Sequence, residues 1–198
     1  MLSVRIFLSV LILIFSIQLS AKADNISDFQ IENMSIGDSL LEFMSENEIN
    51  QSIIDYFPDQ RKYYVIAKID NLKTYEQLEI YLKTNDKKYI IRTLGAFTSF
   101  PDKKCLQSKK KIDEEFNVIF SNLKSYSATI NHTYDKSGKS KQIQTNYVFG
   151  DSAHKDDHIR TECTSWSEEI KQKDGFKDSL IVIAMTEEIL RWIDNNYD

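Results

Sequence analysis

The residues most able to do chemistry gather in one short segment, residues 151–158. Two imidazoles and three carboxylates lie there: Asp151, His154, Asp156, Asp157 and His158. Histidine nitrogen and carboxylate oxygen can hold zinc or another divalent ion, and a histidine among acids can also serve hydrolysis. The spacing matches no established metal motif, and acidic residues are ordinary in a loop between two strands. The segment is a candidate metal or hydrolytic site, with a solvated loop as the alternative.

Motifs of known catalytic machinery do not occur in the rest of the sequence. There is no glycine-rich phosphate loop, no His-Glu-x-x-His and no Cys-x-x-Cys. Ser165 is not preceded by the glycine of a nucleophile elbow. His132 lies on the apolar side of a predicted strand, where a hydrogen-bonded histidine at the edge of the core is expected rather than a general base. We expect no cofactor, and a non-enzymatic role is favoured.

The two cysteines, Cys105 and Cys163, predict one disulfide. Cys105 begins a predicted helix on its inward side, and Cys163 shares a strand face with Ile159. Both side chains should therefore point into the layer between helix and sheet, with their Cα atoms within about 7 Å. The competing interpretation is a reactive thiol, which needs an activating base such as His132.

Residues 74–94 predict a two-faced β-hairpin whose outer face is a candidate partner site. The face expected in the core carries Leu78, Ile80, Leu82, Tyr89 and Ile91. The outer face carries Tyr75, Glu79, Tyr81, Ile90 and Arg92. Tyrosine and arginine often anchor interfaces, so this face is a candidate binding site. A turn at Asn85-Asp86 would set Glu79 opposite Arg92. The alternative is that a helix from the other half covers this face.

The hydrophobic periodicity along the chain predicts an α+β fold, with antiparallel sheet packed against helices. Ser39 with Glu42, and Ser45 with Glu48, fit helix capping boxes, and the second helix would carry Ile49, Ile53 and Ile54. Strands are expected over residues 63–69, 75–83, 88–100, 126–134, 143–149, 159–163 and 180–185. A long helix is expected over 101–123 and a last one after 186. The elements form two possible helix-plus-meander halves, 30–100 and 101–198.

Residues 1–23 have the pattern of a cleavable secretory signal peptide. Arg5 precedes a short apolar run over residues 6–19, and Ala21-x-Ala23 suits a signal peptidase. Cleavage would leave a single domain of residues 24–198, periplasmic in a Gram-negative cell and otherwise secreted. An uncleaved N-terminal anchor is the alternative. No second apolar stretch has the length of a membrane span.

The composition favours an ordered, acidic protein. Its formal net charge is −5, and its basic residues are interspersed with acids, so nucleic acid is not expected as a partner. Glycine and proline number only 5 and 2 among many aromatic residues, which argues against disorder and favours strands.

The segment from Ile31 to Leu40 resembles the helix-start motif of the BamE/SmpA-like envelope proteins. Asn33 stands where that family has glycine, and the family's later Gly-x-Pro is missing. The whole chain resembles uncharacterised exported proteins of AT-rich bacteria, which share a Met-Ser-Ile-Gly-Asp-Ser start and a Lys-Tyr-Ile-Ile strand. That resemblance implies no activity. The succession of helix and sheet is similar in layout to the β-lactamase inhibitor proteins.

Three functional hypotheses follow. The first is a non-enzymatic binding or envelope accessory module with a protein or small-molecule partner. The second is a carrier of a small apolar ligand in a cavity between sheet and helices. The third is a hydrolase that uses the acidic loop with His154 and His158.

Overall fold

The computed structural model of the chain describes residues 24–56, 62–68, 70–100, 104–152 and 155–197. The predicted signal segment and its cleavage site, residues 1–23, lie outside the described residues, and so does His154. Among the described helices, none is both long enough and apolar enough to cross a bilayer.

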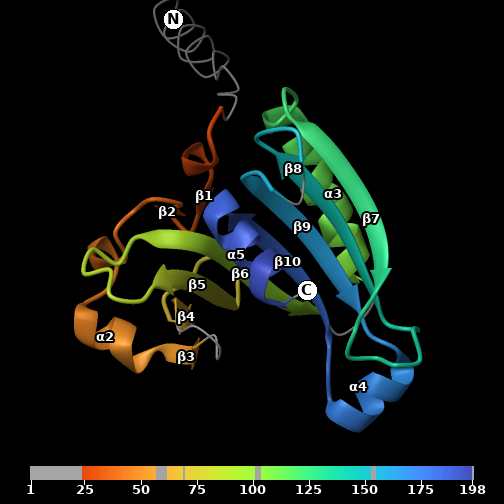
Figure 1. Cartoon of the computed structure of the whole chain (residues 1–198). Coiled ribbons are helices and arrows are strands. Elements are labelled where there is room, and N and C mark those ends of the chain that lie inside the picture. Colours follow the sequence, from red (N-terminus) through yellow and green to blue (C-terminus); the bar gives the residue numbers. More distant parts are fainter. Residues whose placement is uncertain (1–23, 57–61, 69, 101–103, 153–154, 198) are drawn as a thin grey trace, which may run out of the picture.

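An antiparallel sheet of eight strands forms the body of the fold (Figure 1). Its spatial order is β3-β4-β5-β6-β10-β9-β8-β7. The strands are β3 (Ile53–Tyr56), β4 (Tyr63–Lys68), β5 (Gln77–Lys83), β6 (Ile91–Phe100), β7 (Lys124–Asn131), β8 (Lys141–Val148), β9 (His158–Ser165) and β10 (Asp178–Met185). The pairing of β6 with β10 joins the two chain halves into one sheet. A small separate hairpin pairs β1 (Gln30–Ile31) with β2 (Met34–Ser35).

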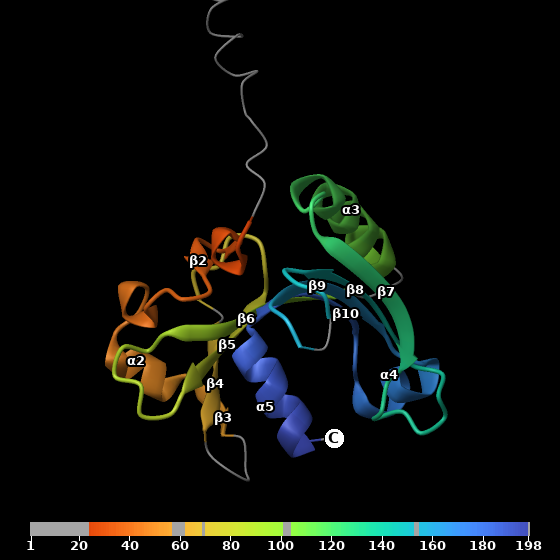
Figure 2. The ribbon, with the colours of Figure 1, turned by 45° about the horizontal axis from the view of Figure 1, so that its top comes forward.

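Helices lie on both faces of this sheet. They are the 3-10 helices η1 (Ile26–Asp28) and η2 (Leu40–Glu42), and the α-helices α2 (Glu46–Gln51), α3 (Lys104–Ile119), α4 (Glu168–Asp174) and α5 (Glu187–Tyr197). Helix α3 packs on β9 and β10, and α5 lies on the other face, in the hollow of the curved sheet (Figure 2). The α+β prediction, with antiparallel sheet against helices, is confirmed.

The main core fills the space between the α3 face of the sheet and the N-terminal segment. Its fully buried strand residues include Leu78, Ile80, Leu82 and Ile91, as the alternation predicts, whereas Tyr89 is half-buried. Edge-to-face aromatic pairs close the core under α3, with ring centroids of Phe116 and Phe120 5.2 Å apart. The core also contains Ile26, Ile31, Met34, Leu40, Leu94 and Tyr147.

The predicted disulfide between Cys105 and Cys163 is present, with a Cα–Cα distance of 5.8 Å. Cys105 lies in the first turn of α3 and Cys163 in the middle of β9. The bond therefore fixes the start of the helix to the centre of the sheet, beside buried Leu180.

The capping box predicted at Ser39 is wrong. Ser39 makes no side-chain cap, because its hydroxyl instead donates to the carbonyl of Lys88 at 2.7 Å, and only the short η2 follows. The capping box of Ser45 and Glu48 is confirmed at the start of α2. That helix ends at Gln51, so Ile53 and Ile54 lie in β3 and not on the helix.

The register predicted for the 74–94 hairpin is also wrong. Tyr81 pairs with Thr93, and Glu79 lies opposite Gly95 rather than Arg92. The connection is longer than a two-residue turn, because the carboxylate of Asp86 accepts the backbone N–H of Lys88 and keeps these residues out of the ladder.

Helix α4 was not predicted, although its end signals are present in the sequence. The side chain of Ser167 accepts the backbone N–H of Ile170 at the N-terminus, and Gly175 ends the helix with φ 72°.

Candidate functional site

The outer face of the predicted hairpin is largely covered by α5. Tyr81 packs in a small cluster with Tyr63, Ile189 and Trp192, and the rings of Tyr63 and Trp192 are 4.9 Å apart. This is the alternative considered from the sequence, in which a helix covers the face. Tyr81 is thus part of the packing between sheet and helix.

Glu188 on α5 binds the charged groups of that same face. Its carboxylate lies 3.7 Å from the Arg92 guanidinium and 3.2 Å from the Lys83 ammonium, and it accepts the Tyr63 hydroxyl at 2.7 Å. Burial acts to raise the pKa of Glu188, but the bonds from Tyr63 and Lys83 outweigh it and lower that pKa. Arg92 is therefore committed to an intramolecular ion pair.

The remaining three residues of the predicted binding set are dispersed. Tyr75 packs against the main core, on the other side of the sheet from Tyr81. Ile90 is half-buried in an isolated bridge to Ser39. Burial raises the pKa of Glu79, which accepts a hydrogen bond from Gln77. The set Tyr75, Glu79, Tyr81, Ile90 and Arg92 does not form one open surface.

The carboxylates of the predicted metal loop bind backbone groups. Asp156 accepts the backbone N–H of Asp151 at 2.6 Å and of Ser152 at 2.8 Å, and these bonds lower its pKa. Asp157 accepts the N–H of Glu187 at 2.7 Å, at the first residue of α5. In the described part of the chain, no group of three or more potential ligands could hold a metal ion.

The other members of that loop also have structural contacts. The carboxylate of Asp151 pairs with Lys124 at the start of β7. His158 is completely buried at the start of β9, with Nδ1 3.3 Å from the carbonyl of Asp156. The loop therefore shapes the chain between β8 and β9 and anchors the beginning of α5.

His132, the other histidine considered from the sequence, packs against Trp166 with the two rings tilted by 45°. Their ring centroids are 4.2 Å apart, and Nδ1 of His132 accepts the N–H of Tyr134 at 3.2 Å. Tyr134 and Phe176 continue this aromatic cluster beside α4 and are exposed. The hydrogen-bonded role expected for His132 is thus present, with the ring half-buried.

The structure brings together a groove that the sequence patterns did not reveal. It has a volume of about 620 Å³ and lies across β7, β8 and β9 on the face opposite α3. Its lining consists of Tyr126, Ala128, Ile130, Gln144, Asn146, Asp151, Ser152 and Arg160. Tyr126 and Ile130 are 42% and 44% exposed, so the apolar side of β7 faces solvent and not the core. Alternation identified this side of the strand, but it did not show which side α3 would cover.

Arg160 gives the groove a positively charged floor. Its Nε donates to Oδ1 of Asn146 at 2.8 Å, which orients the guanidinium. Burial lowers the pKa of Arg160 from its ordinary value, and nearby Glu162 opposes this, but an arginine stays charged in a protein. Within the described residues, no carboxylate lies in ion-pair range of this guanidinium. The carboxylate of Glu162 instead accepts a hydrogen bond from Gln142 at 2.9 Å.

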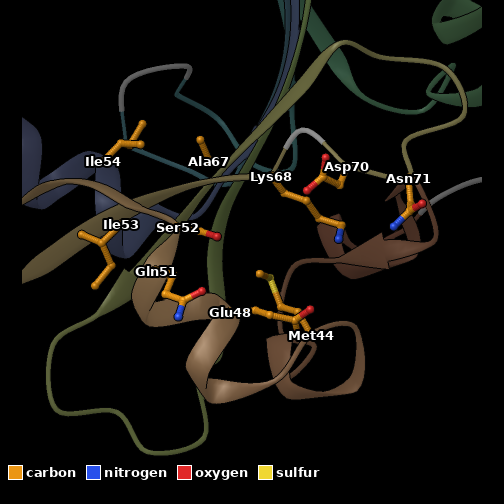
Figure 3. Close-up of a pocket in the computed structure, with 10 residues that line it drawn as sticks. All are labelled: Met44, Glu48, Gln51, Ser52, Ile53, Ile54, Ala67, Lys68, Asp70 and Asn71. Carbon is orange, nitrogen blue, oxygen red and sulfur yellow. The ribbon is translucent and has the colours of Figure 1, made fainter.

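A second hollow of about 470 Å³ lies between α2, β3 and the end of β4 (Figure 3). Its lining is Met44, Glu48, Gln51, Ser52, Ile53, Ile54, Ala67, Lys68, Asp70 and Asn71. Figure 3 shows the side chains of Lys68 and Asp70 on one side of it and Glu48 on the other. Glu48 already caps α2, and the hollow has no aromatic wall, so it is the weaker candidate for binding.

A buried polar cluster lies under α3. Lys109, on the buried side of the helix, donates to Asp113 at 2.6 Å and to Thr145 at 2.8 Å. Asp113 also accepts the hydroxyl of Thr161. Because the two charges satisfy each other, this cluster is structural.

Comparison of the chain with protein-family models, with curated proteins and with solved structures found no match. The functional inference therefore depends on the geometry of the described residues.

Proposed function

We propose that this chain is an exported, non-enzymatic binding module that captures a protein partner in the groove across β7, β8 and β9. The observation that carries the proposal is the oriented guanidinium of Arg160, which has no carboxylate partner among the described residues and lies beside exposed apolar side chains.

The chemistry of the groove defines what would fit it. A half-buried guanidinium favours a carboxylate, which it can bind through two parallel hydrogen bonds. Tyr126 and Ile130 offer apolar contact area next to that charge, and aromatic and arginine side chains are frequent anchors of interfaces. The occupant we propose is a polypeptide segment with an acidic residue next to a large apolar one.

The two alternative functions have less support. A hydrolase would need a free general base in the acidic loop, but Asp156 and Asp157 accept backbone hydrogen bonds there. A carrier would need an apolar cavity between α3 and the sheet, but Phe116, Phe120 and Tyr147 fill that layer. His154 of the loop lies outside the described residues.

Export is part of the proposal. The disulfide between Cys105 and Cys163 supports it, since such bonds persist in oxidising compartments. We propose that residues 1–23 are removed and that the mature protein begins at Asp24. Intact-mass analysis of protein recovered from the culture or periplasm tests this, and a retained N-terminal segment would refute cleavage.

Selection from a displayed random-peptide library tests the binding site. The wild-type chain should enrich peptides in which Asp or Glu neighbours a large apolar residue. Arg160→Gln should lose the acidic preference, and Tyr126→Ala should weaken the apolar one. Lys110→Gln, which removes an exposed cation from α3 on the opposite face, should select like the wild type.

Each variant is first compared with the wild type by thermal melting, so that a selection change is read only from folded protein. Identical selection by wild type and Arg160→Gln, or no enrichment by the wild type, would show that the groove is not the binding site.

A further inference from the structure

Strand β7 is an edge strand without the usual protection against pairing. Among the described strands it pairs only with β8, in a continuous register from Lys124 to Asn131, and all of its residues are exposed. Natural edge strands are normally shortened, bulged, charged or interrupted by proline. At the other edge of the sheet, β3 is short and its register shifts between Ile53 and Asp55. In β7 the only charge is Lys124 at its first residue.

The free backbone groups of β7 belong to alternate residues. The N–H of His132, just beyond the strand, donates to the carbonyl of Ser140 on the β8 side. Because the backbone direction alternates along a strand, the even-numbered residues of β7 face β8 and the odd-numbered ones face outward. The outward residues are Ser125, Ser127, Thr129 and Asn131.

We infer that β7 pairs with β7 of a second copy of this chain, antiparallel about a two-fold axis that passes through Ala128. An axis perpendicular to the sheet keeps the groove face of both copies on the same side, so even residues must lie opposite even residues. Centred on Ala128, the pairing sets Ser127 opposite Thr129 and Ser125 opposite Asn131. Every outward residue of β7 then exchanges hydrogen bonds within the two strands.

If the axis passed through Ser127 or Thr129 instead, one outward residue of each β7 would lie opposite a residue outside the β7 strand of the other copy. The axis at Ala128 also sets Tyr126 of each copy opposite Ile130 of the other, and aromatic and β-branched side chains form favourable cross-strand pairs. A self-complementary edge of this kind favours a second copy over an unrelated strand, because β7 itself supplies both members of every cross-strand pair.

The dimer would join the two sheets and place the two grooves side by side across the axis. This inference goes beyond the proposed function, since a single copy has a whole groove and could capture a partner alone. Failure of peptide selection would therefore not contradict the dimer. A monomeric protein would likewise not contradict peptide binding in the groove.

Cysteine crosslinking on the exported protein tests the register. Ala128 would lie opposite its own copy in a non-hydrogen-bonded pair, where Cα atoms are about 4.5 Å apart, within reach of a disulfide. The native cysteines are already bonded to each other. Under mild oxidation Ala128→Cys should form a covalent dimer. Ile130→Cys, the matched control on the same exposed face, should form no covalent dimer because its opposite residue is Tyr126.

A charge swap at the axis tests the same contact without a covalent bond. The wild type should be a dimer by light scattering, and Ala128→Lys and Ala128→Glu should each be monomeric because like charges meet at the axis. Mixing the two variants should restore a dimer. Since Ala128 is exposed, both variants should still fold, and their far-UV circular dichroism should match that of the wild type. A monomeric wild type, equal crosslinking of both cysteine variants, or no dimer on mixing would each overturn the inference.

Discussion

Removing the carboxylate of Asp113 should destabilise this protein far more than removing an exposed carboxylate on the same helix. Asp113 pairs with Lys109 at 2.6 Å, and the side chains of Lys109 and Asp113 are 6% and 21% exposed. It also accepts hydrogen bonds from Thr145 and Thr161. In Asp113→Ala, the ammonium of Lys109 would stay buried, and among the described residues it would keep only the Thr145 hydroxyl as a partner.

The expected loss of unfolding free energy is set by the ammonium of Lys109, which stays buried without its carboxylate. Breaking a buried ion pair by removing one partner costs about 3–5 kcal/mol. Water reaches part of Asp113, so we expect about 3 kcal/mol for Asp113→Ala, which lowers the melting temperature by about 6–12 °C in a chain of this size. Lys109→Met should cost only about 1 kcal/mol, because Asp113 keeps its hydroxyl donors and the methionine fills the space. The double variant, which buries no charge, should cost about 2 kcal/mol.

Urea unfolding of the four proteins completes a double-mutant cycle. The matched control is the i,i+4 pair Lys110 and Glu114 on the same helix, which is 79% and 65% exposed. The corresponding Lys110→Met and Glu114→Ala should each change stability by less than about 0.5 kcal/mol. A cost for Asp113→Ala no larger than that of Glu114→Ala, or simple additivity in the cycle, would refute the reasoning.

Two further predictions concern covalent and electrostatic constraints. Replacing Cys105 and Cys163 together by alanine should lower the free energy of unfolding by about 4 kcal/mol. The two residues are 58 apart in sequence, so the unfolded chain regains the conformational entropy of a long loop. A loss below about 1 kcal/mol, measured by urea unfolding, would contradict this. Hydrogen bonds from Ser137 and Ser140 hold the pKa of Asp135 well below its usual range. Its stabilisation is thus present above the unfolded-state pKa and is lost as pH falls through about 4 and below. Stability of the wild type should decrease more steeply with acid than that of Asp135→Asn, and parallel pH profiles would show that this carboxylate is not involved.

Local patterns in the sequence determined the elements and several of their contacts. The spacing of three and four over residues 104–119 places Cys105 and Phe116 on the buried side of α3. Alternation in β5 places Leu78, Ile80 and Leu82 in the core. The capping box at Ser45 and the two-cysteine count also led to correct predictions, since each depends on neighbours in the chain or on a single possible pairing.

The sequence predictions were wrong where a side chain could have bonded a neighbour in the chain but bonded a group distant in sequence instead. Ser39 has the sequence of a helix cap, but its hydroxyl binds the carbonyl of Lys88, which no local pattern reveals. Asp156 and Asp157 belong to a segment rich in potential metal ligands. Their carboxylates instead accept hydrogen bonds from backbone N–H groups, in the same loop and at the start of α5. Competition between partners far apart in sequence is resolved only when the chain is folded.

The candidate site was decided by which face of the sheet each helix covers. Alternation shows that a strand has an apolar side, but not which side will be covered. Helix α5 covers the apolar side at Tyr81, and the disulfide and α3 cover the opposite face of β9 and β10. The apolar side of β7 is therefore left open at Tyr126, beside Arg160 from another strand. The sequence alone determined the strands that supply the groove, whereas the packing of two helices on opposite faces determined that it exists.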